Sequence, residues 1–260
     1  MSVAIYDAVG AWPPDPTRPL GGSEMGTVLL AKTLKATIYG RHSTPPSETP
    51  DVTIVQRWSP VPRWAEGGHI FIQAHDIVRQ EYKNHWGREI VCVSEYQKKG
   101  FVAAGFPESS IKVIRPILDD YSHLRAVKKR PGRWLYPTAT NKGLQATLEK
   151  WVHFPVPEGR LIVTTSGYDA PEPGLCERYG AFYQPCQSPA WLAAQIAQSE
   201  GIFYVNTAPE CYPMTIAIAR YLGLKMRLEC RGHESCGIAE ALEGHDLSAA
   251  AIKSQWEALF

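Results

Sequence analysis

Residues 202–223 restrict the fold of this chain more than any other stretch, because a strand, a tight loop and a helix follow one another there. Residues 202–205 are all apolar and predict a strand, and Asn206-Thr-Ala-Pro then predicts a turn. After the turn, apolar residues recur with helical spacing at Met214, Ile216, Ala217, Ile218, Tyr221 and Leu222. This order of elements indicates an α/β fold.

Glu210 is the acidic residue at the point where this loop leads into the helix. In an open α/β sheet, ligands bind just outside the carboxyl ends of the strands, so we expect Glu210 to face a ligand. A carboxylate at this place also meets the free backbone N–H groups of the first helical turn. Glu210 is therefore also a candidate helix cap.

The same succession of strand, polar or glycine residue, and helix recurs at four other places. They are Gly21-Gly22 after residues 3–9, His75 after residues 69–74, Ser94 after residues 90–93, and Lys142 after residues 133–136. Because ligands bind at the carboxyl ends of such strands, we expect two sheet edges that face each other across one cleft. Each signal also has a structural alternative: a tight turn for Gly-Gly, a helix cap for the histidine, and simple exposure for the lysine.

The stretch around Glu210 resembles the donor-binding signature of family 4 of the retaining nucleotide-sugar glycosyltransferases. In that family a strand leads into Pro-Glu, seven residues follow, a second Glu comes next, and a Gly stands five residues further on. Pro209, Glu210 and Gly223 match this pattern, whereas Ile218 stands in the place of the second acid. The resemblance implies that Glu210 contacts hydroxyls of the donor sugar. The carboxylate that usually holds the nucleotide ribose has no counterpart in this chain.

Other segments are similar to the same family along essentially the whole chain. Gly21-Gly22-Ser23-Glu24 looks like its glycine loop, with Ser23 as the expected helix cap, and Val93-Ser94-Glu95 resembles its Val-Ser-Glu step. His75-Asp76 is similar to its position beside the reacting carbon. Lys142-Gly143 resembles its phosphate-binding basic residue followed by Gly.

The resemblance implies the GT-B architecture, in which two Rossmann-like domains face each other across a cleft. Residues 1–124 are the expected acceptor domain, residues 125–240 the expected donor domain, and residues 241–260 a helix that crosses back to the first domain. Asp119 matches the Asp that ends the family's first domain, with Pro116-Ile117-Leu118 in place of Pro-Asn-Gly. Residues 122–132 are then the expected interdomain linker, whose basic run we interpret as an exposed charged segment.

The activity implied by the resemblance is retaining transfer of a hexose from a UDP- or GDP-linked sugar to an acceptor hydroxyl. His75, Lys142 and Glu210 are the expected catalytic residues. The residues expected to bind the donor or its phosphates are Gly21, Gly22, Ser94, Gly143, Thr207, Cys211, Tyr212, Pro213 and Met214. A lysine and helix N-termini supply the positive potential that a departing diphosphate needs, and no tightly bound cofactor is expected.

Trp12, Trp58 and Trp64 are the candidate residues of the acceptor site, because an exposed tryptophan can stack on a sugar ring or a base. The alternative is that these tryptophans pack proline-rich loops onto the domain. The acceptor is a saccharide or, as for some virus-encoded members of similarly compact size, a hydroxymethylated base in DNA. The balance of 27 Lys and Arg against 26 acids argues against a general attraction to nucleic acid.

Two departures from the family pattern keep a non-catalytic alternative open. Ile218 and Pro116-Ile117-Leu118 replace residues of the signature, so a catalytically silent protein that only binds a nucleotide sugar or a glycan is the third hypothesis.

Cys230, His233 and Cys236 have the spacing of metal ligands. Three ligands do not complete a tetrahedral site, and no metal is expected.

The remaining composition bears on the compartment. Six cysteines in 260 residues are typical of reduced thiols and not of a disulfide framework. The first residues lack the features of a signal peptide, and no apolar run approaches the ~20 residues of a membrane span. We therefore expect a cytoplasmic protein, located in the host cytoplasm if the chain is virus-encoded. No pattern indicates the oligomeric state.

Overall fold

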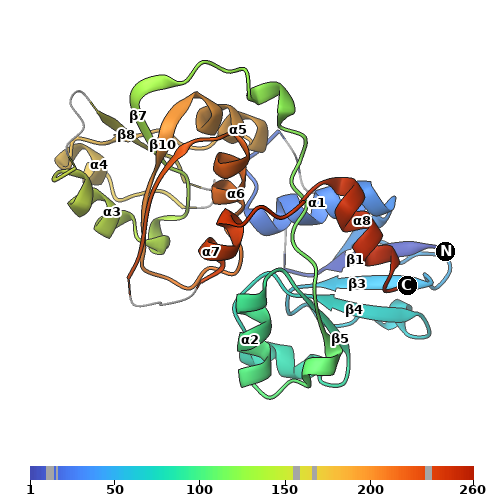
Figure 1. Cartoon of the computed structure of the whole chain (residues 1–260). Coiled ribbons are helices and arrows are strands. Elements are labelled where there is room, and N and C mark those ends of the chain that lie inside the picture. The colour runs from blue at the N-terminus through green and yellow to red at the C-terminus, as the bar shows by residue number, and fades with distance from the viewer. Residues whose placement is uncertain (10–14, 16, 155–158, 166–168, 232–235) are drawn as a thin grey trace.

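The computed structural model describes residues 1–9, 15, 17–154, 159–165, 169–231 and 236–260. Its strands form a six-stranded sheet in the order β2-β1-β3-β4-β5-β6 and a five-stranded sheet in the order β11-β10-β7-β8-β9. All paired strands run parallel within both sheets. The sheets belong to two domains that lie side by side (Figure 1). The predicted α/β class is confirmed.

The first domain is built on the six-stranded sheet. Its elements are β1 (Val3–Asp7), α1 (Gly22–Leu34), β2 (Thr37–Gly40), β3 (Val52–Gln56), η1 (Arg63–Ala65), β4 (His69–Gln73), η2 (Gln80–His85), β5 (Glu89–Cys92), α2 (Glu95–Ala103), η3 (Glu108–Ser110), β6 (Ile111–Val113) and η4 (Ser122–Leu124), where η marks a 3-10 helix. All five residues of β3 are buried. Continuous burial of this kind is typical of a parallel strand covered on both faces.

The second domain is built on the five-stranded sheet. Its elements are β7 (Arg130–Tyr136), η5 (Thr140–Lys142), α3 (Leu144–Trp151), β8 (Arg160–Val163), α4 (Leu175–Arg178), β9 (Phe182–Tyr183), α5 (Pro189–Gln198), β10 (Ser199–Asn206), α6 (Met214–Tyr221), β11 (Lys225–Cys230) and α7 (Gly237–Leu242). The linker predicted at residues 122–132 is wrong for its last three residues. They belong to β7, because Arg130 pairs with Ser199 across an irregularity in β10.

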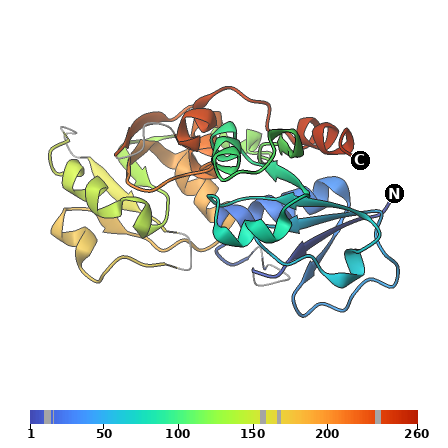
Figure 2. The same cartoon turned by 90° about the horizontal axis from the view of Figure 1, so that it is seen from below.

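A last helix, α8 (Ala249–Glu257), crosses back to the first domain, as predicted. Ser248 caps it, since its hydroxyl accepts a hydrogen bond from the Ala251 N–H at 3.3 Å. Ile252 and Trp256 are fully buried in the core of the first domain, and the Trp256 ring meets Phe71 edge-on at 6.0 Å. The N- and C-termini therefore lie on the same side of that domain (Figures 1 and 2).

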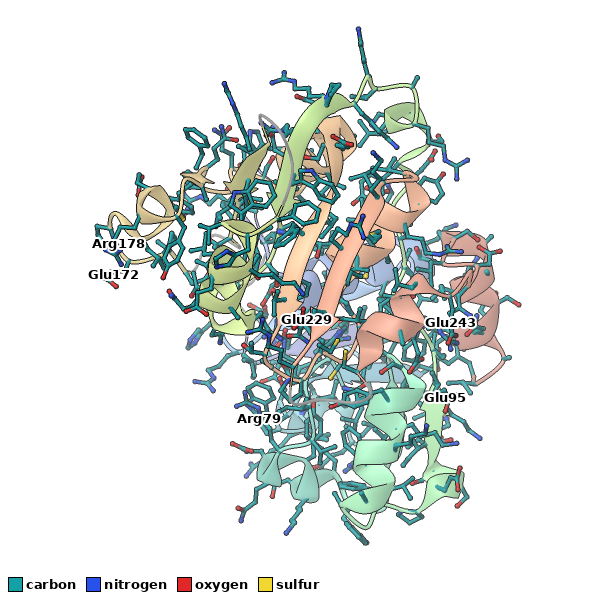
Figure 3. All side chains as sticks on the ribbon, turned by 60° about the vertical axis from the view of Figure 1, so that its left-hand side comes forward. Arg79, Glu95, Glu172, Arg178, Glu229 and Glu243 are labelled. Atoms are coloured by element: carbon teal, nitrogen blue, oxygen red, sulfur yellow. The ribbon has the colours of Figure 1, made fainter. Side chains whose placement is uncertain are left out.

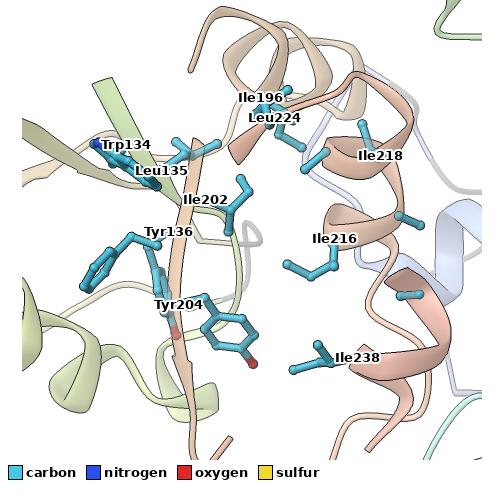
Figure 4. Close-up of a cluster of buried hydrophobic side chains, with 14 of the residues drawn as sticks. Trp134, Leu135, Tyr136, Ile196, Ile202, Tyr204, Ile216, Ile218, Leu224 and Ile238 are labelled. Carbon is cyan, nitrogen blue, oxygen red and sulfur yellow. The ribbon is translucent and has the colours of Figure 1, made fainter. Parts of the chain in front are cut away.

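Part of the core of the second domain lies between its sheet and α6, as Figure 4 shows. Tyr136 and Tyr204, from the neighbouring strands β7 and β10, meet with ring centroids 5.6 Å apart. Ile216 reaches toward this sheet from α6, and Ile218 of the same helix belongs to the same buried cluster and is only 7% exposed. The position of the family's second acid is therefore part of the hydrophobic core in this chain.

Candidate functional site

Lys142 and Glu210 form an ion pair at the carboxyl ends of two adjacent parallel strands. Lys142 is the last residue of η5, which follows β7, and Glu210 lies in the loop after β10. Lys142 Nζ lies 3.1 Å from Glu210 Oε2. The two side chains are 29% and 12% exposed, so both remain accessible from the edge of the sheet. The structure thus brings together the cation and the acid that the sequence predicts for one site.

Gly143 allows this close approach of the two loops. Its φ of 116° lies in the left-handed region, and a Cβ added there would lie 2.1 Å from the Val205 carbonyl oxygen. The Thr207 N–H donates to the Lys142 carbonyl at 3.2 Å. No side chain fits between the η5 turn and the end of β10, so a glycine is required to hold Lys142 in place.

The carboxylate of Glu210 has a second polar neighbour. The Tyr204 hydroxyl lies 3.5 Å from Glu210 Oε1 and donates to Asn206 Oδ1 at 2.9 Å. α6 begins only at Met214, its N-cap residue is Pro213, and no side chain caps it. Glu210 therefore pairs with Lys142 and does not cap α6, which leaves the N–H groups of the first turn of α6 without a side-chain cap.

His75 follows β4, where the sequence predicts it. Its Nε2 lies 2.6 Å from Gln56 Oε1, and Gln56 Nε2 donates to Gln73 Oε1 at 2.8 Å. Burial and, to a smaller extent, the positive charge of Arg57 lower the pKa of His75 to about 3. The imidazole is therefore neutral near pH 7. It donates from Nε2 to Gln56, which leaves Nδ1 as an acceptor.

Arg57 is a residue of this site that the sequence does not single out. Its side chain is 11% exposed and forms ion pairs with Glu24 of α1 and with Asp7 at the end of β1, the second at 3.7 Å. Its φ of 58° is unusual for a residue other than glycine. One signal in the sequence could have pointed to Arg57. The residue before it, Gln56, is polar and ends an otherwise almost apolar strand.

Asp76 connects the two domains electrostatically. Burial raises the pKa of its carboxyl group, and the positive charges of Arg57 and Arg79 oppose that rise. The ammonium group of Lys142, from the other domain, acts on Asp76 in the same direction. Lys142 and Asp76 are therefore close enough to influence each other across the interface.

The glycine loop lies opposite the start of α6. α1 begins at Gly22 with Gly21 as its N-cap residue, and no side chain caps it. The prediction that Ser23 caps this helix is wrong, because Ser23 lies inside the first turn, where its carbonyl accepts from the Thr27 hydroxyl. A Cβ added to Gly22 would lie 3.8 Å from Met214 Cγ. The uncapped starts of α1 and α6 therefore meet from the two domains.

Ser94 is fully buried, and its hydroxyl caps α2 by accepting from the Gln97 N–H at 3.1 Å. Glu240, from α7 of the second domain, accepts from the N–H groups of Glu95 and Tyr96 at 3.0 and 2.7 Å. An acid from the other domain therefore already occupies the start of α2. That Ser94 contacts a phosphate stays a prediction.

The residues around Glu210 differ in how far they are exposed to solvent. Thr207 is exposed and Met214 half-buried, whereas Cys211, Tyr212 and Pro213 are buried. Burial raises the pKa values of the Cys211 thiol and the Tyr212 hydroxyl to about 12, so both groups are neutral at pH 7. Donor contacts from the three buried residues would come from their backbone.

The candidate acceptor tryptophans occupy different surroundings. Trp64 packs on Tyr6 and Tyr39 with ring centroids 5.8 and 5.2 Å apart, which is the loop-packing alternative. The Arg79 guanidinium lies 4.5 Å from the centre of the Trp58 ring. Trp12 lies outside the described residues. Acceptor binding by these residues stays a prediction.

The two cysteines with metal-ligand spacing lie at the end of β11 and before α7. Cys230 Sγ and Cys236 Sγ are 3.3 Å apart, both thiols are free, and His233 falls outside the described ranges. Within those ranges, no three potential metal ligands of the His, Cys, Asp and Glu types come together.

Among the described residues, no helix is long and apolar enough to span a membrane.

Glu229, labelled in Figure 3, is the last residue but one of β11. Glu229 forms ion pairs with Lys150 and, at 2.8 Å, with Arg231. The edge of the second sheet therefore carries a further charged cluster, in which one acid is shared by two basic side chains.

Comparisons with known proteins show similarity in structure only. No protein-family model and no curated sequence matches the chain. Anabaena Alr3699/HepE in complex with UDP-glucose superposes with a TM-score of 0.65 at 13% identity, covering 100% of this chain and 91% of that one. AviGT4, a glycosyltransferase involved in avilamycin A biosynthesis, gives 0.65 at 13% identity over 99% and 96%. UDP-N-acetylglucosamine 2-epimerase from Rickettsia bellii gives 0.56 at 10% over 100% and 96%.

These matches extend over both domains. The chain has the GT-B fold, with two Rossmann-like domains facing each other, as the sequence predicts. The epimerase shares this arrangement, so the activity must be argued from the residues of the site.

Proposed function

We propose that this protein is a glycosyltransferase that moves a hexose from a nucleoside diphosphate sugar to an acceptor hydroxyl with retention of anomeric configuration. The observation that carries the proposal is the Lys142–Glu210 ion pair. At one sheet edge it places an ammonium group 3.1 Å from a carboxylate, which can accept hydrogen bonds from sugar hydroxyls. The similarity in fold to HepE, whose structure holds UDP-glucose, and to the glycosyltransferase AviGT4 supports it.

Donor binding opens the ion pair in this proposal. The ammonium group of Lys142 turns to the diphosphate, which replaces one anionic partner by another, and Glu210 accepts hydrogen bonds from the sugar hydroxyls. The uncapped N–H groups at the starts of α1 and α6 supply further positive potential for the phosphates. Gly21, Gly22 and Gly143 keep these loops free of side chains that would exclude the donor.

The transfer proceeds by attack on the same face from which the diphosphate leaves. The glycosidic C–O bond breaks and its electron pair stays on the phosphate oxygen. The acceptor oxygen bonds to the anomeric carbon, and the acceptor proton passes to the departing phosphate. Lys142 stabilises the charge that develops on the leaving group. Neutral His75 lies beside the sugar and offers Nδ1 as an acceptor.

UDP is the first nucleotide to test, because HepE binds UDP-glucose. A thermal-shift series with UDP-, GDP- and ADP-glucose on the full chain identifies the base. A donor at 100 times its dissociation constant stabilises the fold by about 2.7 kcal/mol. We expect one of the three to raise the melting temperature clearly and the other two to have smaller effects. No shift with any nucleotide sugar contradicts the proposal.

Turnover is then measured by mass spectrometry of the released diphosphate, with and without acceptors, and the anomeric configuration of the product by NMR. Saccharides and DNA containing hydroxymethylated bases form the two acceptor arms. A product of retained configuration in either arm supports the proposal and names the acceptor class. Binding of a donor without turnover under any condition favours the silent binding protein, for which the buried Ile218 is the supporting observation.

A further inference from the structure

A cavity of about 550 Å³ lies between the two domains, away from Lys142 and Glu210. Its walls come from α1, from residues 117–120, from the second half of α6, and from the segment between α7 and α8. In Figure 1, the chain leading to α8 runs through this region, beside α1. Residues 117–120 lead toward the second domain, and the segment before α8 returns from it. Both covalent connections therefore line one cavity.

The cavity and the candidate site lie at opposite ends of the same two helices. α1 and α6 start beside each other at the site, where Gly22 faces Met214. The cavity is lined further along these helices, by Lys32 of α1 and Arg220 of α6. At 1.5 Å per residue, the ten residues from Gly22 to Lys32 span ~15 Å. A molecule lodged between the far halves of α1 and α6 therefore acts on the spacing of their starts.

The inner wall of the cavity is apolar. Leu29 of α1, Ile117, Ala217 of α6 and Leu247 are all lining residues and are at most 8% exposed. An apolar wall favours a ligand with an apolar body, because transfer of such a body out of water is favourable. A volume of this size is in the range of small-molecule sites, roughly 300–1,000 Å³.

The rim of the cavity is acidic. Asp119, Asp120 and Asp246 line it, and within the described part of the chain none of the three forms an ion pair within 4.0 Å. Each accepts one backbone N–H at 2.9 Å, from Asp120, Ser122 and Ser248 respectively. Hydrogen bonds from the side chain and backbone of Ser122 lower the pKa of Asp120, and those from the backbone and side chain of Ser248 lower the pKa of Asp246, so both carboxylates are charged at neutral pH.

The other charged groups of the rim do not neutralise this excess. Glu243 is already paired with His245, whose Nε2 lies 2.7 Å from its Oε2. Arg220 Nε donates to the Leu242 carbonyl at 2.6 Å. Apart from the Glu243–His245 pair, the lining holds three acids, Asp119, Asp120 and Asp246, against two bases, Lys32 and Arg220. The cavity thus favours a cation over an anion.

We propose that this cavity binds a small organic cation with an apolar body, of the aryl-alkyl ammonium class, and that its occupation sets the spacing of the two domains. The ammonium group lies among the rim carboxylates, and the apolar body lies against Leu29, Ile117 and Ala217. Because the bound molecule contacts both domains and both connections, it couples to any ligand that needs the two domains at a particular spacing.

The direct test is calorimetric titration of the full chain with 4-phenylbutylammonium, and in parallel with 4-phenylbutyrate. The two probes share an apolar body and differ in the sign of their charge. We expect the cation to bind with a dissociation constant of ~0.1–1 mM, the range for a ligand of this size. We expect the anion to bind at least tenfold more weakly. Equal binding of the two probes overturns the proposal.

Variants locate the binding to this cavity. The double variant Asp119→Asn/Asp246→Asn keeps the oxygens that accept backbone N–H groups but removes two rim charges. Ala249→Trp, at an exposed lining position in α8, fills the cavity. We expect each variant to weaken binding of the cation at least fivefold. The control Glu48→Gln/Glu81→Gln changes the net charge equally at exposed positions outside the cavity, and it should bind like the parent. Parent-like binding in both cavity variants overturns the assignment.

The coupling is measured as the dissociation constant of UDP with the cavity empty and with it saturated by the cation. We expect at least a threefold change, and the same factor for the cation when UDP is saturating, as linkage requires. An unchanged UDP affinity at saturating cation overturns the claim about domain spacing. This last arm rests on the proposed function. If UDP does not bind at all, the proposed function fails. The titration with the two probes still decides whether the cavity binds an organic cation.

Discussion

The carboxylate of Glu240 lies 3.3 Å from the guanidinium group of Arg115, so an ion pair joins the two domains beside the hydrogen bonds that two N–H groups of α2 donate to Glu240. Glu240→Ala removes all of these contacts and leaves two helix N–H groups and a half-buried arginine without this partner. We expect a loss of about 2 kcal/mol in the free energy of unfolding, measured by urea denaturation. Glu243→Ala, an exposed control one residue after α7, should cost about 0.5 kcal/mol or less. Equal losses would show that the Glu240 contact does not hold the domains together.

Lys142→Ala tests the leaving-group role. It removes the ammonium group that neutralises the departing phosphate, and we expect kcat at saturating donor to fall by about 100-fold or more. Lys98→Ala is the control, because Lys98 also forms an ion pair, with Glu108, but on the surface of the first domain. An unchanged kcat in the Lys142 variant removes this residue from the mechanism.

Glu210→Gln separates the sugar from the nucleotide. The amide still offers an oxygen to sugar hydroxyls, but it no longer attracts Lys142. We therefore expect free UDP to bind at least as tightly as to the parent, because no ion pair has to open. We expect kcat/KM for the donor sugar to fall roughly tenfold, since a charged acceptor is replaced by a neutral one. Titration calorimetry and initial rates measure the two effects. Weaker binding of free UDP to this variant contradicts the assignment of Glu210 to the sugar.

We expect the free energy of unfolding to depend on pH, because two histidines are buried in their neutral form. Burial lowers the pKa values of His75 to about 3 and of His85 to about 4. In the unfolded chain both titrate near 6.5, so below that pH the unfolded state binds protons that the folded state does not. The contribution of these two histidines to stability should therefore be constant above pH ~7 and should fall as the pH decreases through 6.5 toward 4.

His75→Gln isolates one of these contributions. Its amide can donate to Gln56 in place of Nε2, and it does not titrate. We expect the difference in unfolding free energy between pH 7 and pH 5 to be smaller in this variant by about 2 kcal/mol. Urea titrations at both pH values measure it. The same slope in parent and variant would mean that His75 titrates normally in the folded protein.

Gly143→Ala and Gly180→Ala form a matched pair. Both residues have a positive φ, 116° and 68°, so both substitutions strain the backbone. Only at Gly143 would the new methyl group meet a backbone oxygen, 2.1 Å away, whereas nothing lies within 4 Å at Gly180. We expect Gly180→Ala to cost about 1 kcal/mol and Gly143→Ala more than twice that in thermal or urea unfolding. Similar costs would show that the η5 turn can move away from β10.

The sequence predicts the fold well because most of the information is local. The strands are short apolar runs and the helices have periodic apolar faces, so β4, β5 and β10 were predicted within one to three residues. The predicted approach of Lys142 and Glu210 is confirmed, because parallel neighbouring strands bring their carboxyl ends to one edge. The cap at Ser23 was predicted wrongly, since a serine favours the N-cap position but the helix begins one residue before it.

What the sequence does not predict depends on contacts between distant residues. Glu240 and Arg115 are 125 residues apart, and neither stands in a motif. Arg57 looks like part of a loop rich in tryptophan and proline until the structure shows it buried between Glu24 and Asp7. The interdomain cavity is likewise formed by four segments that are far apart in the sequence.

The burial of Trp256 against Phe71 has a consequence for biosynthesis. The first domain takes part of its core from a helix that the ribosome makes only after the whole second domain, roughly 185 residues after Phe71. At ~5–20 residues per second this delay is about 10–40 s. Throughout that interval the nascent first domain presents the apolar surface that Ile252 and Trp256 later cover. A chaperone that shields this surface during translation should therefore increase the yield of folded protein.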